Sequence, residues 1–144
     1  MEITNSRARF DYEILDKWEA GMRLTGAEVK AVRAGSMSLK AAYITIRNEE
    51  IFLINAHIGP YAKAIQKNYD PTETRKLLLH KKEIKRLIGL TKQKGLTLIP
   101  LKVYSSHNKL KLEFGLGRGR SRIDKRAVIK KRDIDREIKT TLSL

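Results

Sequence analysis

The strongest constraint on the fold is a strict alternation of apolar and charged side chains close to residue 110. Apolar residues take every second position and charged ones fill the positions between them: Leu110, Leu112, Phe114 and Leu116 against Lys109, Lys111 and Glu113. Successive side chains of a β-strand point to opposite faces. Residues 109–116 are therefore predicted to form a strand with one face in a core and the other in water.

More strands are predicted on both sides of the chain's middle. The run "LTLIPLKVY" precedes the alternating segment, and Pro100 within it indicates an edge or a bulge, because proline donates no ladder hydrogen bond. The runs "SLKAAYITIR" and "IFLINAHI", joined by a polar turn at 48–50, indicate a hairpin. In "FDYEI" the alternation of Phe10, Tyr12 and Ile14 predicts one further strand.

Two helices are predicted between these strands. Thr25 and Glu28 have the spacing of a capping box at the start of "TGAEVKAVRAG", and Gly35 supplies a stop. The run "KLLLHKKEIKRLIGLTKQKG" has an amphipathic pattern and predicts a second helix, broken near Gly89-Leu90-Thr91 and ended by Gly95. The segment from Gly59 to Arg75 lacks periodicity and is expected to be a long loop.

The order of these elements favours a mainly β fold. Strand, helix, two strands, helix and two strands do not alternate as βαβ units would. We expect a small antiparallel, partly open β-barrel of the oligonucleotide-binding kind, with two or three helices packed on it, over residues 1–119. After Gly119 the strand pattern stops. Residues 120–144 are expected to form a mobile basic tail with a helix from about Lys130 that folds on binding.

Charge indicates the class of partner. The chain carries 31 Lys and Arg against 16 Asp and Glu, a net charge of +15. Such a field attracts polyanions, and nucleic acid is the usual one. A membrane surface would require a basic helix with a strong apolar face, which no segment shows. No apolar stretch approaches a membrane span, no secretory signal is expected at the N-terminus, and cysteine is absent, which together favour a cytoplasmic protein.

The sequence gives little support to an enzyme. His57, His80 and His107 match no metal-ligand spacing. A histidine pair cleaves RNA in some basic ribonucleases, but unrelated turn and helix-start histidines explain these three more simply. No catalytic residue, metal site or cofactor is therefore expected.

Residues for RNA contact are easier to name. "NSRARF" places Asn5, Arg7 and Arg9 beside Phe10, a mixture of donors and a stacking ring that suits RNA. Solvated charges at a strand edge explain the two arginines equally well. Lys111 lies on the outer face of the last predicted strand, where either a polyanion or simple solubility accounts for it.

Seven motifs together carry a resemblance to a known family. They are "NSRARFDYEI", "EAG", "LTGAEVKAVRAG", "HIGPY", "DPTETRKLLLHKKEI", "KGLTLIPLKVY" and "GLGRGRSRIDKRAVIKKRD". In their order and spacing, from about Asn5 to Ile138, the chain resembles the bacterial tmRNA-binding SmpB family.

The resemblance implies a fold and a function. Proteins of this family have an oligonucleotide-binding barrel with packed helices, bind the tRNA-like domain of tmRNA and enter stalled ribosomes with it. Trans-translation follows, in which the nascent peptide is tagged for proteolysis and the ribosome is released. Elongation factor Tu with alanyl-tmRNA is a further expected partner, and the protein is expected to be a monomer without enzyme activity. A general RNA-binding barrel, such as a ribosomal protein or RNA chaperone, is the alternative.

The resemblance also assigns residues on the body of the protein. The family's tmRNA contacts correspond to Asn5, Arg7, Glu19, Leu78 and Lys111. A carboxylate such as Glu19 accepts hydrogen bonds only from base N–H groups, so it adds specificity rather than attraction. Leu78 either supports an unstacked base or lies in the core.

In the tail, the resemblance implies contacts with the decoding centre and the empty mRNA channel. The expected contact residues are Gly119, Arg120, Asp124, Lys125, Arg126, Lys130, Lys131 and Arg132. Two positions depart from the family pattern: Ser121 replaces a frequent lysine, and Ile123 replaces a frequent His or Tyr that stacks on a base. Asp124 within this basic run is the best local sign of a tail that is recognised residue by residue.

Overall fold

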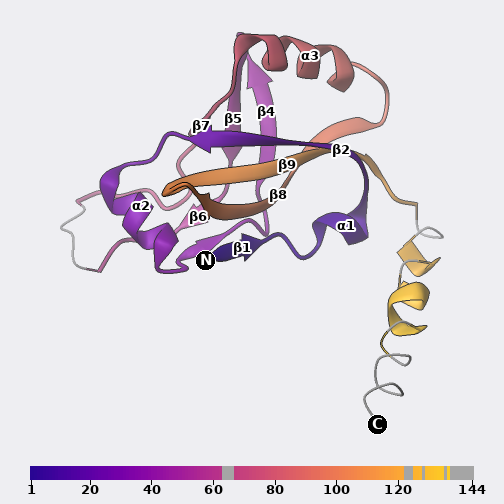
Figure 1. Ribbon diagram of the computed structural model, residues 1–144, viewed down its shortest axis with the longest axis horizontal. Coiled ribbons are helices and arrows are strands. Elements are labelled where there is room, and N and C mark those ends of the chain that lie inside the picture. The colour runs from indigo at the N-terminus through magenta and orange to yellow at the C-terminus, as the bar shows by residue number, and fades with distance from the viewer. Residues whose placement is uncertain (63–66, 122–124, 128, 135, 137–144) are drawn as a thin grey trace.

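A seven-stranded antiparallel sheet forms the body of the protein (Figure 1). The computed structural model describes residues 1–62, 67–121, 125–127, 129–134 and 136. The strand order is β1-β8-β9-β2-β7-β5-β4, and a two-stranded sheet pairs β3 with β6. The strands are β1 (Glu2–Thr4), β2 (Tyr12–Met22), β3 (Met37–Ser38), β4 (Tyr43–Arg47), β5 (Glu50–Ile54), β6 (His57–Ile58), β7 (Arg75–Leu78), β8 (Leu96–Ser106) and β9 (Lys109–Gly119).

The sheet curls without closing. Its edge strands, β1 and β4, do not pair with each other in the described part of the chain, although β4 packs beside β8. The predicted mainly β, partly open antiparallel barrel is therefore confirmed. Three helices accompany it: α1 (Ala8–Asp11), α2 (Gly26–Arg33) and α3 (Lys81–Thr91).

The two hairpins predicted from the sequence are present. β8 pairs with β9 from Leu96↔Arg118 to Ser106↔Lys109, and the register shifts between Pro100 and Lys102, as the proline indicated. His107 and Asn108 connect these strands with positive φ, the geometry of a tight two-residue hairpin turn. β4 and β5 are joined in the same way by 48–49. The alternating residues of β9 supply the centre of the core, where Leu112 and Phe114 are fully buried.

The prediction of a strand starting at Phe10 is wrong. Residues Ala8–Asp11 form one helical turn, in which the N–H groups of Phe10 and Asp11 both bond to the carbonyl of Arg7, and β2 begins only at Tyr12. This turn buries Ala8 against Ile99 and Leu101 in a small second core. Alternation over three residues did not outweigh that packing.

The predicted helix from Lys76 is also wrong at its start. Residues Arg75–Leu78 form β7, which fills the sheet between β2 and β5, and α3 begins at Lys81. Sheet pairing here overrides the helix propensity of leucine. The helix runs through Gly89 and ends at Thr91, within the stretch 89–91 where a break was predicted and short of the predicted end at Gly95. Its residues Ile84 and Leu87 are buried in the main core. The short strand β1 carries no alternating pattern and was not predicted. The strands β3 and β6 lie at the ends of the runs 38–47 and 51–58, which were predicted as one hairpin, and they pair separately as a two-stranded sheet.

The predicted capping box of α2 is confirmed. The Thr25 hydroxyl accepts from the Glu28 N–H at 3.1 Å, and the Glu28 carboxylate accepts from the Thr25 N–H at 3.0 Å. Gly35, with φ of +86°, follows the helix end.

Beyond β9 the chain leaves the body and carries helical residues at 125–127 and 129–134, so helical conformation is present at Lys125, ahead of the expected Lys130 (Figure 1). In the described residues, no helix has the length and apolar character needed to cross a membrane.

Candidate nucleic-acid interface

A row of four residues crosses the outer face of the sheet. It consists of Tyr104 of β8, Lys111 of β9, Gly21 of β2 and Leu78 of β7. Directly opposed residues of antiparallel strands project to the same side. The side chain of Leu78 is 48% exposed, whereas Leu77 beside it is 1% exposed. Of the two interpretations of Leu78, the structure therefore favours an exposed contact over a core position.

A second row lies two residues along the same strands. Lys102, Glu113 and Glu19 are opposed across β8, β9 and β2. Two lysines, Lys17 and Lys102, lie 3.4 Å from the Glu113 carboxylate and offset the repulsion between the two acids. Glu19 is exposed and accepts a hydrogen bond from the Tyr104 hydroxyl. This hydrogen bond orients the Glu19 carboxylate on the surface, where its other oxygen can accept a hydrogen bond from a ligand.

A hollow of about 380 Å³ adjoins the first row. Gly21, Leu78 and Lys111 are among its lining residues, with Val29 and Arg33 of α2 on another side. A Cβ atom on Gly21 would lie 3.3 Å from the Cβ of Leu78, tighter than an ordinary contact. The apolar floor and cationic rim suit a planar base with its phosphate.

Arg33 also fixes the tip of the β8–β9 hairpin beside this hollow. Its guanidinium donates to the Asn108 carbonyl at 2.7 Å and to the Ser105 hydroxyl at 3.4 Å. Sequence reasoning identified neither Arg33 nor Tyr104 as part of the surface. Their positions depend on how the hairpin tip meets α2 and on the strand register, and neither follows from local pattern.

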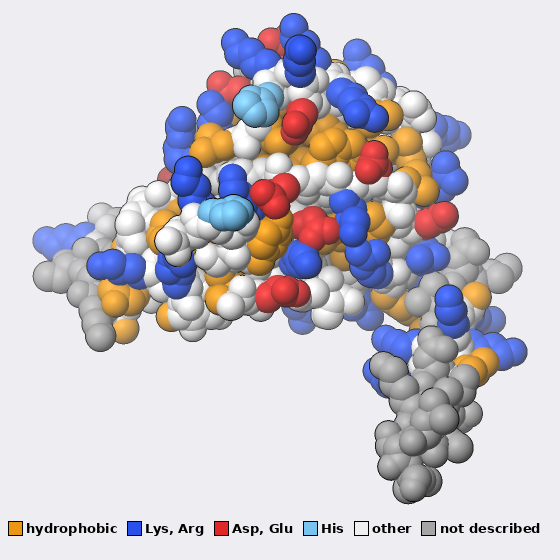
Figure 2. All heavy atoms as spheres, in the orientation of Figure 1, with side chains coloured by type: hydrophobic (Ala, Val, Ile, Leu, Met, Phe, Trp, Pro, Cys, Tyr) orange, Lys and Arg blue, Asp and Glu red, His pale blue; other side chains and the backbone are white. Residues whose placement is uncertain are grey.

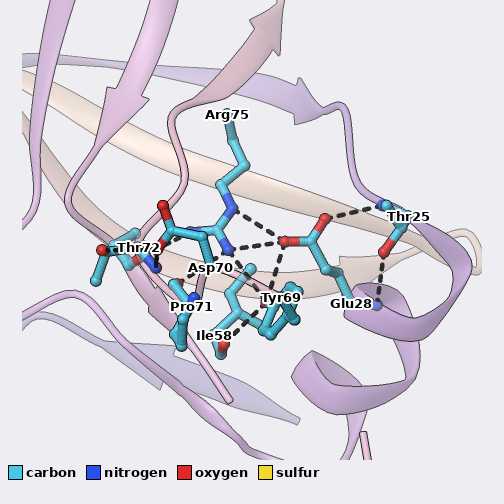
Figure 3. A network of polar contacts seen from close by, with 9 residues as sticks. Thr25, Glu28, Ile58, Tyr69, Asp70, Pro71, Thr72 and Arg75 are labelled. Atoms are coloured by element: carbon cyan, nitrogen blue, oxygen red, sulfur yellow. Dashed lines mark hydrogen bonds and ion pairs between the residues drawn. The ribbon is translucent and has the colours of Figure 1, made fainter. Parts of the chain in front are cut away.

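A buried ion pair holds the two sides of the hollow together (Figure 3). Arg75, at the start of β7, donates to the Glu28 carboxylate of α2 at 2.7 and 3.1 Å, and the two residues are 3% and 4% exposed. The Tyr69 hydroxyl lies 3.2 Å from a Glu28 carboxylate oxygen and 2.9 Å from the Ile58 carbonyl, and its single proton is shared between these two acceptors. Because α2 carries Arg33 and β7 carries Leu78, this network sets the distance between the hollow's walls.

The same network changes the titration of its acidic groups. Burial on its own would raise the pKa of Glu28, but the N–H of Thr25 and the Arg75 guanidinium outweigh it and hold that pKa below its ordinary value. Burial, followed by the negative charge of Glu28, raises the pKa of Tyr69. Glu28 therefore remains charged in the fold, as a buried partner of arginine requires.

The N-terminal segment lies along β8. Asn5 is fixed to the body: its side-chain amide donates to the Pro100 carbonyl at 2.9 Å and its N–H to the Leu101 carbonyl at 2.8 Å. Arg9 borders a hollow of about 350 Å³ that Lys17 and Lys102 also line. Asn5 lines this hollow too, so the segment continues the surface that begins at Leu78.

Arg7 lies elsewhere, at the base of the tail. It contacts Asp11 at 3.4 Å, and its guanidinium carbon lies 4.5 Å from the centre of the Phe10 ring. Lys125 approaches the same two groups, with its ammonium 3.3 Å from Asp11 and 5.7 Å from the ring centre. The structure therefore brings Glu19, Leu78 and Lys111 together but places Arg7 with the tail.

The predicted tail residues begin where β9 ends. Gly119 pairs with Tyr12, and Arg120 donates from its N–H to the Asp11 carbonyl at 2.9 Å and from Nε to the Arg9 carbonyl at 3.1 Å. The following predicted residues are exposed and lie on helical segments: Arg126, Lys130, Lys131 and Arg132. Asp124, with Arg122 and Ile123, lies outside the described residues.

The histidines are separated by the fold. His57 is in β6, His80 precedes α3 and His107 is in the β8–β9 turn, all of them exposed. Over the part of the chain that the structure describes, no group of three metal-binding side chains occurs. The geometry adds nothing to the ribonuclease alternative.

Known proteins resemble this chain over nearly its whole length. The family model described as "SmpB protein" matches residues 2–143. An "SsrA-binding protein" of Acaryochloris marina is 52% identical over 139 residues, which are 96% of this chain and 90% of the relative. The "SsrA-binding protein" of Enterococcus faecalis is 49% identical over 138 residues, again 96% and 90% of the two chains.

A solved structure agrees with these sequence matches. It is described as "tmRNA-SmpB: a journey to the center of the bacterial ribosome" and is 44% identical, with a TM-score of 0.70. The similarity covers 89% of this chain and 94% of that chain.

Proposed function

The chain belongs to the SmpB family, and we propose on this basis that it binds the tRNA-like domain of tmRNA and delivers it to stalled ribosomes for trans-translation. Relatives named for binding SsrA and a similar chain described with tmRNA and the ribosome support this function. The surface chemistry of this chain supports it independently.

One observation carries the proposal: an exposed leucine beside a surface acid in a protein of net charge +15. Phosphate attraction requires neither residue. Leu78 packs over Gly21 and offers apolar contact to a base with its exposed side. Glu19, oriented by Tyr104, accepts only from donors such as base N–H groups. Lys111, on the neighbouring strand β9, supplies a point charge for a phosphate.

The tail is assigned the second task. We infer that its basic residues occupy the decoding centre and the empty mRNA channel, so that an intact message excludes them. Arg126, Lys130, Lys131 and Arg132 are exposed on helical segments that project away from the barrel (Figure 1), which suits this role. Gly119 and Arg120 begin the tail, and Asp124 and Lys125 belong to the same proposed contact.

Further partners and properties follow from the same proposal. Elongation factor Tu with alanyl-tmRNA is the partner that brings the complex to the ribosome, and the protein acts as a cytoplasmic monomer. It works by binding and not by catalysis. Asn5 and Arg9 belong to the tmRNA surface, and Arg7 contributes to it from the base of the tail.

The test is a competition between two RNAs at about 0.15 M salt. A labelled tRNA-like-domain RNA is bound to the protein and displaced by bulk tRNA. Glu19→Gln should weaken the labelled complex by roughly tenfold, since a hydrogen bond to a charged group contributes about 1.5–3 kcal/mol. The control is Glu73→Gln, an exposed acid in a loop, which makes the same change in charge.

The general RNA-binding alternative makes a different prediction. If affinity depends on phosphates alone, both substitutions raise the affinity for both RNAs slightly, because each removes a negative charge. That outcome would contradict a tmRNA-specific surface.

A further inference from the structure

The solvent face of α3 carries a dense group of cations that the surface described above does not use. At 3.6 residues per turn, Lys81 and Lys85 lie along one line of the helix, and Lys92, the C-cap residue just after α3, continues that line. Lys82 and Arg86 lie along the next line. All five are exposed. The longer line extends over about 16 Å. Figure 2 shows Lys and Arg side chains gathered over this helix at the top of the view.

Among the described residues, these five cations have no acidic partner in an ion pair. Lysines elsewhere on the surface, such as Lys17, Lys76 and Lys102, form ion pairs with glutamates. In the ranges that the structure describes, none of the five on α3 does. Glu83, the one acid of α3, is only half exposed. The face therefore presents uncompensated positive charge to solvent.

Gly89 lies between the two lines of cations, in the middle of this face. Glycine within a helix is unfavourable relative to alanine, and packing does not explain it here, since no atom lies within 4 Å of a Cβ built at this position. A glycine with open space above it permits another molecule to approach the helix backbone closely. The side chains of Lys85, Arg86 and Lys92 surround that gap.

We propose that the solvent face of α3 binds the sugar–phosphate backbone of an RNA duplex, at the same time as the tRNA-like domain occupies the Leu78 surface. A duplex backbone carries a regular series of phosphate charges, and a face of five exposed cations neutralises such charges without any apolar contact. The proposal extends the proposed function by a second RNA contact on the body of the protein.

An acidic protein partner fits this face less well. Specific protein interfaces have an apolar or aromatic centre. The exposed large apolar residues of the described chain are Met1, Leu15, Tyr43, Leu78 and Ile134, and none of them is on α3. Because the helix buries its apolar residues in the core, it leaves nothing for a protein partner to bury.

The first experiment measures binding of the full chain to a plain RNA duplex of about 16 base pairs, with tRNA-like-domain RNA already bound at saturation. The variant K81Q/K85Q/K92Q should weaken duplex binding by at least about tenfold and lower the slope of log K against log salt by roughly 2 to 3. The control, K40Q/R47Q/K67Q, removes the same charge from exposed residues elsewhere and should change affinity by less than about threefold.

A second pair of variants isolates the centre of the face. Gly89→Glu and Gly89→Gln add side chains of one size into open space, and both residues favour helix over glycine. Neither should lower the melting temperature. The glutamate variant should weaken duplex binding by at least about tenfold more than the glutamine variant, because it places a carboxylate among the cations.

Three results would overturn the proposal. If the α3 triple variant and its control weakened duplex binding equally, the duplex would be held by the net charge of the protein and not by the α3 face. Loss of tRNA-like-domain binding by the α3 variant would assign α3 to the first RNA. A competition experiment compares polyglutamate with unlabelled RNA duplex as displacers of the bound duplex. Displacement by polyglutamate at the lower concentration of charges would indicate that the α3 face binds an acidic protein. Failure of the proposed function can be told apart from these results. In that case Glu19→Gln would not weaken the binding of tRNA-like-domain RNA, whatever the α3 variants do to duplex binding.

Discussion

Leu77 and Leu78 are neighbours in β7 whose side chains point to opposite faces of the sheet. Leu77 is buried in the main core and Leu78 is exposed above Gly21. At the scale of the single residue, the same leucine-to-alanine substitution can be made at both positions. It is expected to affect the stability of the fold at Leu77 and the affinity for RNA at Leu78.

Leu77→Ala should lower the free energy of unfolding by about 2–5 kcal/mol, the usual range for a truncated core leucine. Leu78→Ala should change it by less than about 0.5 kcal/mol and should instead weaken tRNA-like-domain binding by roughly tenfold, from lost apolar contact. Urea denaturation and RNA titration of both variants check this. A large loss of stability in Leu78→Ala would place that leucine in the core.

Glu28 gives the fold a pH dependence. Its folded-state pKa lies below the ordinary value of 4.5, so the charged group stabilises the fold fully above that pH, and the contribution is lost as pH falls through the lowered pKa. Glu28→Gln should cost about 3–5 kcal/mol at neutral pH, since it leaves Arg75 buried without its partner.

Denaturation curves between neutral pH and pH 3 measure this dependence. The Glu28→Gln variant should lose less stability over the acid range than the unmodified protein. Asp133→Asn, at an exposed tail position, is a control that should leave the curve unchanged. Parallel acid profiles for Glu28→Gln and the unmodified protein would contradict the assignment.

The elements of the fold differ in how far local pattern predicts them. β9 and the start of α2 follow from the sequence, because alternation and a capping box determine them within a few residues. β7 does not, since "RKLL" has no alternation and becomes a strand only by pairing with β2 and β5. Arg75 was missed for the same reason: its burial depends on Glu28, which is 47 residues earlier in the chain.

The candidate site divides in the same way. The chemistry of Lys111 is visible in a strand that the pattern predicts, whereas the resemblance was needed to select Glu19 and Leu78. The neighbours that orient them, Tyr104 and Gly21, come from the strand register, which local sequence does not determine.

A substitution at Gly89 measures how much this glycine lowers the stability of helix α3. Gly89→Ala should raise the free energy of unfolding by about 0.5–1 kcal/mol, because alanine restricts the unfolded chain and a methyl group meets no neighbour. Thermal unfolding measures the gain, with Gly35→Ala as a contrast. Gly35 has φ of +86°, so alanine there should destabilise. A destabilised Gly89→Ala variant would mean that α3 is strained at this residue.

At the scale of the whole molecule, the barrel and the tail are predicted to have separate tasks. Replacing Asp124, Lys125 and Arg126 with alanine should leave the affinity for tRNA-like-domain RNA within about threefold and abolish peptide tagging. The small change in affinity is expected because Glu19, Leu78 and Lys111 lie on the sheet and not on the tail.

A reconstituted tagging assay with stalled ribosomes, beside RNA titration, measures both quantities. The matched control is K40A/R47A/E73A, which removes two cations and one acid from exposed positions of the barrel, as the tail variant does from the tail. If RNA affinity collapsed in the tail variant, the division between barrel and tail would be wrong.

Arg120 and Lys125 both contact Asp11, and these contacts set the direction in which the tail leaves the barrel. A helix that continues from such an anchor has a defined direction. Each residue inserted after Arg126, within the described helical residues 125–127, would rotate the helical residues that follow it by about 100° and advance them by about 1.5 Å. With alanine as the inserted residue the charge of the tail would be unchanged, yet the basic side chains beyond the insertion would face a new direction. The proposed contacts of the tail with the ribosome would then depend on the direction in which it leaves the barrel as much as on its sequence.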